Sequence, residues 1–116
     1  MNNIVGRKSR YMQDTLPIRM GGLAANLARV SSFSDFDGSR LAVIGLIEES
    51  KYFIEWTAIE YDLSTTVELL DIQRLLAKWH LNIDSIWDDL ANRKEIGAQA
   101  KKLSDRLLTK SGLLNQ

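Results

Sequence analysis

The chain has 116 residues, of which 45% are apolar and 26% charged, and its formal net charge is zero. This length fits one domain, and the composition excludes a disordered chain and a membrane-spanning one, since the longest apolar run, Leu41 to Ile47, falls short of the roughly 20 residues of a bilayer span. The absence of cysteine excludes disulfides and thiolate metal sites, and residues 1–13 lack the apolar core of a secretory signal, so we expect a soluble, cytoplasmic protein without a membrane partner.

The first 13 residues have no apolar period, so we expect a flexible arm over residues 1–13 and a single helical domain over residues 14–116. The arm carries three basic residues and one aromatic residue: Arg7, Lys8, Arg10 and Tyr11. Such residues suit phosphate contacts and base stacking. Because the whole chain is neutral, we expect a solubilising tail and no nucleic-acid partner.

A first helix is predicted from Thr15, which can cap it, to about Val30. Its apolar residues recur at steps of four and three: Leu16, Met20, Leu23, Leu27 and Val30. The adjacent glycines Gly21 and Gly22 each destabilise a helix interior by about 1 kcal/mol relative to alanine. They predict either the close approach of a neighbouring segment or a kink.

A turn over residues 31–38, rich in serine, aspartate and glycine, separates this helix from a second one over residues 39–60. The second helix carries an apolar stripe made of Leu41, Ile44, Ile47, Ile54 and Ala58. We expect this stripe to face the core.

Thr65 and Glu68 have the spacing of a capping box and predict the start of a third helix. Its stripe consists of Leu69, Ile72, Leu76, Trp79, Ile83 and Ile86. Asn82 and Asp84 leave open whether this helix ends near them or continues.

A similar pair, Asn92 and Glu95, predicts a fourth helix that ends at Gly112. Four helices with short connections predict an all-α fold, an up-and-down antiparallel four-helix bundle.

No pattern for metal or cofactor binding is present. His80 is the only histidine, which is too few for the common zinc and iron sites, and no Glu-x-x-His pair occurs. We therefore expect no metal and no cofactor. Glu48 and Glu55 share a face of the second helix, but exposed carboxylates of this kind are common, and acid–base catalysis would need a pocket that separates their pKa values.

The strongest enzymatic pattern is Arg74 followed by His80, an Arg-x5-His spacing within a helical domain. It resembles the Arg-x4-6-His motif of HEPN ribonucleases, in which the arginine and histidine act on the RNA backbone at a dimer interface. The resemblance implies a ribonuclease or an RNA-binding helical domain that uses Arg74 and His80. The alternative is that Arg74 is a solvated helix residue and His80 lies at a helix edge.

A second apolar stripe on the second helix is the main candidate interface, and it consists of Tyr52, Trp56 and Ile59. A bundle helix needs only one stripe, so the second either widens the core or contacts another protein. Tyrosine and tryptophan are enriched at the centres of protein interfaces. We therefore expect a protein-interaction or assembly module without catalytic activity, which forms a homodimer or binds another protein. The alternative is the HEPN-like ribonuclease or RNA-binding domain.

Overall fold

The computed structural model describes residues 4–115, which are almost entirely helical and contain no strand. The α-helices are α1 (Ile4–Gln13), α2 (Leu16–Phe33), α3 (Arg40–Thr57), α4 (Leu63–Leu81), α5 (Ile83–Trp87) and α6 (Leu90–Ser111). Three short 3-10 turns are η1 (Asp37–Ser39), η2 (Ala58–Glu60) and η3 (Leu113–Asn115). The all-α prediction is confirmed.

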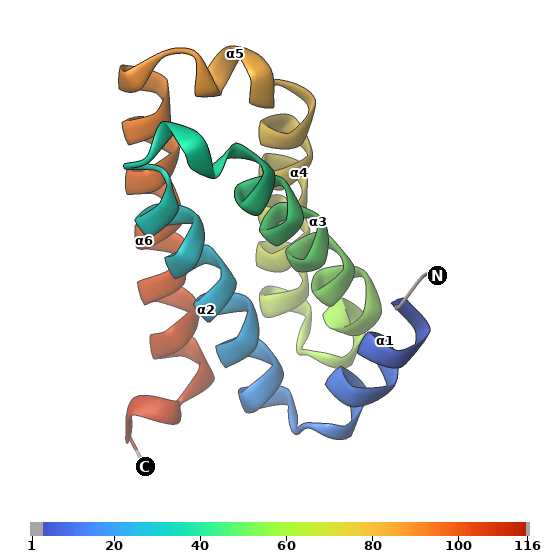
Figure 1. The fold of residues 1–116 in the computed structure, drawn as a ribbon. Coiled ribbons are helices and arrows are strands. Elements are labelled where there is room, and N and C mark those ends of the chain that lie inside the picture. The colour runs from blue at the N-terminus through green and yellow to red at the C-terminus, as the bar shows by residue number, and fades with distance from the viewer. Residues whose placement is uncertain (1–3, 116) are drawn as a thin grey trace.

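The long helices α2, α3, α4 and α6 run in alternating directions along the molecule (Figure 1). The most extensive packing joins α2 to α6, while α3 packs on α2 and α4 packs on α3. The short helix α5 links α4 to α6 along the chain. Glu68 of α4 also forms ion pairs with basic side chains of α6. The predicted number of four helices is too low, because residues 4–115 form six α-helices.

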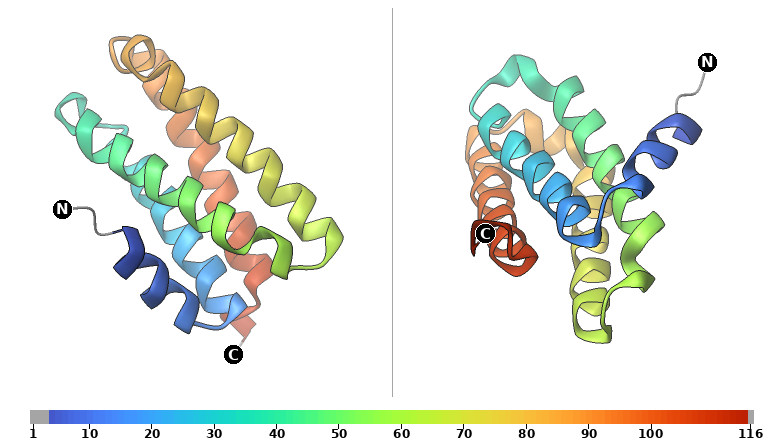
Figure 2. Two further views of the ribbon diagram at one scale, coloured as in Figure 1. Left: turned by 90° about the vertical axis from the view of Figure 1, so that its right-hand side faces the viewer. Right: turned by 90° about the horizontal axis from the view of Figure 1, so that it is seen from below.

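Residues 4–13 of the expected flexible arm form helix α1, which lies outside the bundle beside α3 (Figure 2). Residues 1–3 of the predicted arm lie outside the described residues. Tyr11 anchors α1, because its ring stacks on Phe53 of α3 with the centroids 3.8 Å apart and it is the one buried residue of this helix. A single buried side chain creates no apolar period, which is why the pattern of residues 1–13 did not indicate a helix.

The two predicted capping boxes are wrong, although the helices that they predicted are present. Helix α4 starts at Leu63, after Asp62. Glu68 reaches across to α6 instead of folding back on its own helix. Helix α6 is capped by Asp89, whose side chain accepts a hydrogen bond from the backbone N–H of Ala91 at 2.8 Å.

The helix ends were predicted more closely. Thr15 precedes the first residue of α2, although its side chain makes no capping hydrogen bond. The third helix ends at Leu81, and Asn82 separates it from α5. Gly112 ends α6 in the left-handed conformation with φ of 78°, as expected of a glycine at this position.

Small residues let segments of the chain approach α2 and α6 closely. A Cβ atom added to Gly21 would lie 2.6 Å from Leu113 Cδ1, and one added to Gly22 would lie 3.6 Å from the Tyr11 ring. Gly21 therefore has a packing reason, whereas a methyl group at Gly22 would make only an ordinary van der Waals contact. Further along α2, the Ser104 hydroxyl of α6 donates a 2.7 Å hydrogen bond to the Ala24 carbonyl oxygen.

The core is one cluster of side chains from α2 to α6. Its large members include Met20, Leu23, Leu27, Val30, Val43, Ile47, Ile54, Leu69, Ile72, Leu76, Trp79 and Leu107. On α3 the buried stripe runs through Val43, whereas Leu41, which the sequence pattern placed in the core, is 75% exposed. The stripe of α4 is buried as predicted.

Candidate functional site

A polar groove lies between α3 and α4 and holds several of the predicted site residues. It is a hollow of about 380 Å³, lined by Glu48, Lys51, Tyr52, Glu55, Gln73 and His80. His80 Nε2 lies 3.6 Å from Glu48 Oε1, and Gln73 Nε2 donates a 3.2 Å hydrogen bond to the Lys51 carbonyl oxygen. These two contacts join α4 to α3 across the groove.

The groove brings the two candidate carboxylates together with the only histidine of the chain, but not with Arg74. Arg74 is 81% exposed, and its guanidinium pairs with Asp71 on the preceding turn at 3.1 Å. Residues six apart on one helix point about 120° away from each other. Within one chain, Arg74 and His80 therefore do not converge on a common site.

The described residues contain no cluster of three or more His, Asp or Glu side chains able to hold a metal ion. Within residues 4–115, no helix is long and apolar enough to cross a bilayer.

The aromatic stripe of α3 contacts α1. Tyr52 and Trp56 stack with their ring centroids 5.5 Å apart, and Trp56 also packs at 6.1 Å against both Phe53 and Tyr11. Trp56 is half-buried and Tyr52 lies at the exposed edge of this cluster. Ile59 does not join it, because Ile59 lies in η2 and is 89% exposed.

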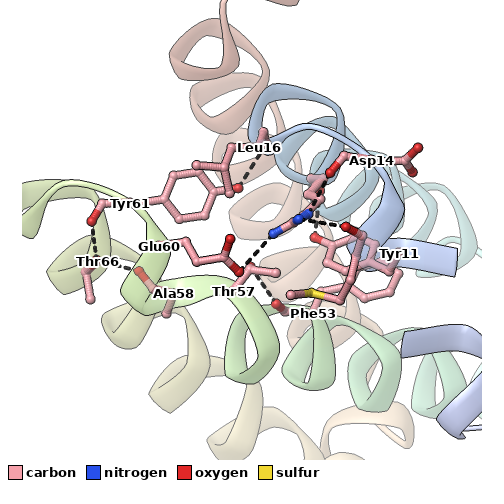
Figure 3. Close-up of polar contacts among 11 residues, drawn as sticks. Tyr11, Asp14, Leu16, Phe53, Thr57, Ala58, Glu60, Tyr61 and Thr66 are labelled. Carbon is pink, nitrogen blue, oxygen red and sulfur yellow. Dashed lines mark hydrogen bonds and ion pairs between the residues drawn. The ribbon is translucent and has the colours of Figure 1, made fainter. Parts of the chain in front are cut away.

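A buried arginine beside the aromatic cluster fixes α1 to the rest of the chain. Arg19 of α2 is 7% exposed and donates to the carbonyl oxygens of Met12 and Asp14 at 2.8 and 2.9 Å and to Glu60 Oε2 at 2.9 Å. Figure 3 shows Tyr11, Asp14 and Glu60 converging on this point from α1, the α1–α2 turn and η2. Buried charges persist in proteins when they are paired and hydrogen-bonded, as this one is.

Tyr11 and Tyr61 belong to the same polar cluster, and each hydroxyl donates to a backbone carbonyl of α2. The Tyr11 hydroxyl donates to the Arg19 carbonyl at 2.7 Å, and the Tyr61 hydroxyl to the Leu16 carbonyl at 3.0 Å. Burial raises the pKa of both phenols above the ordinary value. Both tyrosines therefore stay neutral and serve to position α1 and η2.

An exposed, mainly apolar stripe that was not predicted from the sequence runs along the outer face of α4. It consists of Leu63, Val67, Leu70, Arg74, Ala77 and Leu81, at steps of four, three, four, three and four, and we call it the outer stripe. Leu63 and Leu81 are 81% and 86% exposed, and Val67 and Leu70 are about half exposed. Its spacing was available in the sequence, and it lies opposite the buried stripe of the same helix.

The outer stripe and the polar groove are the two candidate sites on this surface. The groove is lined by polar and charged side chains, including two carboxylates, one imidazole and the Lys51 ammonium group, whereas the outer stripe is apolar except for Arg74, about 27 Å long at 1.5 Å per residue, and exposed. Comparison of the chain with protein-family models, with curated proteins and with solved structures finds no match.

Proposed function

We propose that this chain is a non-catalytic assembly module that forms a homodimer through the outer stripe of α4. The observation that carries the proposal is the exposure of four large apolar side chains in one row: Leu63, Val67, Leu70 and Leu81. A surface helix of a monomeric protein buries its apolar face and presents a polar one. An exposed apolar row on the opposite face is typical of a contact with another protein.

In this proposal the aromatic residues of α3 make contacts within one chain. Trp56 packs against Tyr11 and Phe53, so α1 of the same chain occupies the face that the sequence pattern offered to a partner. Ile59 remains exposed in η2, the turn that leads into α4. The predicted homodimer contact is thus proposed on α4, with Ile59 near its N-terminal end.

The size of the outer stripe sets the expected affinity. A dimer would bury eight large apolar side chains, and at roughly 1–1.5 kcal/mol each, since they are already partly buried, they stabilise it by about 8–12 kcal/mol. Association opposes this by at least about 4 kcal/mol. The net gain of about 4–8 kcal/mol corresponds to a dissociation constant in the micromolar to millimolar range.

The test compares two leucines in matched positions. Leu63 is the first residue of α4 and 81% exposed, and Leu41 is the second residue of α3 and 75% exposed. An aspartate is tolerated in the first turn of a helix, so Leu63→Asp and Leu41→Asp should both fold. Sedimentation equilibrium up to about 1 mM should show a weak dimer for the native chain and for Leu41→Asp, and a dissociation constant raised at least about tenfold for Leu63→Asp. A native chain that stays monomeric, or equal effects of the two substitutions, would refute the proposal.

A further inference from the structure

The pattern of the outer stripe points to the direction in which two copies pair. Resting on the proposed homodimer, we infer that the two α4 helices lie antiparallel, with the two-fold axis at the level of Ile72, between Leu70 and Arg74. Leu63 of each copy then lies opposite Leu81 of the other. Each Arg74 lies beside Asp71 of the opposite copy.

The spacing of the outer stripe is symmetric about this level. Reversal of α4 about its midpoint exchanges Leu63 with Leu81, Val67 with Ala77, and Leu70 with Arg74. A two-fold contact places the same patch of two copies together, so the patch must match its own reversed image. The spacing of the outer stripe meets this requirement along its whole length, and the residue types match at its two ends, where Leu63 faces Leu81.

The charges at the centre of the outer stripe favour the antiparallel direction. Arg74 and Asp71 are the charged pair at this level, 3.1 Å apart, with side chains 81% and 64% exposed. In a parallel pair, Arg74 would face Arg74 and Asp71 would lie level with Asp71, which places like charges together. In the antiparallel pair each guanidinium lies between its own Asp71 and that of the other copy, so four charges of alternating sign surround the axis.

The end of the outer stripe also has a matching shape. A hollow of about 350 Å³ lies beside its C-terminal end, lined by Lys51, Ala77, His80 and Leu81. Ala77 is small, and the hollow opens at the level that Leu63 of the opposite copy reaches in the antiparallel register. A leucine projecting from one helix into a gap between residues of a facing helix is the usual packing of paired helices.

Cysteine cross-linking tests the direction, because the native chain contains no cysteine and every cross-link must come from an introduced one. Val67→Cys and Ala77→Cys replace exposed residues that face each other in the antiparallel register. A short bismaleimide should link a mixture of the two variants and leave each variant alone unlinked, since like positions would be about 15 Å apart along the axis. Linking of Val67→Cys alone would show a parallel pair and overturn the inference while leaving the homodimer intact.

A charge exchange tests the position of the axis. Asp71→Arg makes the centre of the outer stripe wholly positive, and Arg74→Asp makes it wholly negative. Each variant alone should dimerise at least about tenfold more weakly than the native chain, and an equimolar mixture should form a heterodimer close to native affinity. Two variants that dimerise as the native chain does would show that Asp71 and Arg74 lie outside the interface, which overturns the inference; a native chain that is monomeric would instead refute the proposed function.

Discussion

Replacement of Gly97 by alanine tests how closely α6 approaches α2. A Cβ atom at this position would lie 2.2 Å from Ser34 Oγ and 3.2 Å from Ser34 Cβ, and Ser34 is 2% exposed. Alanine by itself favours the helix by about 1 kcal/mol relative to glycine. The contact with Ser34 therefore decides whether Gly97→Ala stabilises or destabilises the fold.

Two responses to the added methyl group are available, and both destabilise the fold. The Ser34 hydroxyl donates a 2.6 Å hydrogen bond to the Ser31 carbonyl oxygen, and its rotation away would leave buried polar groups unpaired at about 1–3 kcal/mol. Alternatively α6 moves outward and loosens its packing on α2. Subtracting the gain in helix propensity, we expect Gly97→Ala to lower the free energy of unfolding by up to about 2 kcal/mol.

Gly45 is the matched control, since it is also a glycine inside a long helix but nothing lies within 4 Å of a Cβ added to it. Gly45→Ala should raise the free energy of unfolding by about 0.5–1 kcal/mol. Urea denaturation monitored by circular dichroism measures both variants, with unchanged m-values expected. If the two substitutions stabilised the protein equally, the close α2–α6 approach described here would be wrong.

Further predictions concern single buried or paired groups. Ser50 Oγ is fully buried without a hydrogen-bond partner among the described residues, whereas the Ser104 hydroxyl is bonded to α2. Ser50→Ala should therefore raise the free energy of unfolding and Ser104→Ala should lower it, each by about 1 kcal/mol in urea denaturation. The Arg106 guanidinium holds the pKa of Glu68 below its usual range, so the ionised Glu68 stabilises the fold above pH 4.5 and this stabilisation is lost as the pH falls below that value. Glu68→Gln should lower the free energy of unfolding by about 0.5–1 kcal/mol at pH 7, and by progressively less in an acid titration of stability. Burial raises the pKa of Tyr11, so the contribution of the neutral phenol to stability is complete below pH 10 and is lost as the pH rises further; Tyr11→Phe should remove this part of the stability loss in an alkaline titration.

The helices could be predicted from the sequence because their buried stripes are long and regular, but their first residues could not. Thr65 and Asn92 match the capping pattern, yet Asp62 and Asp89 occupy the positions before α4 and α6. Aspartate, asparagine and threonine all favour such positions, so several candidates near one helix start compete. Tertiary contacts then decide, as they do for Glu68, which pairs with α6.

The packing of α1 and the Arg19 cluster depend on residues far apart in the sequence. Tyr11 meets Phe53, and Arg19 meets Glu60, and neither pair has a local pattern. A buried arginine is uncommon, so residue type alone does not indicate that Arg19 is buried. Its position becomes understandable only once the α1–α2 turn presents the backbone carbonyls that accept its hydrogen bonds.

The outer stripe of α4 shows a different limit of prediction from sequence, since its apolar spacing lies entirely within one helix. Helix α4 carries two apolar rows about 180° apart, and the inner row accounts for the period by itself, so the outer residues look like scattered exposed leucines. Only the structure shows that Leu63 and Leu81 share one uncovered face. Arg74 interrupts that face at its centre and is stabilised by a facing carboxylate. In the proposed dimer the antiparallel register supplies Asp71 of the second copy, so the arginine that limits indiscriminate apolar association also selects one partner orientation.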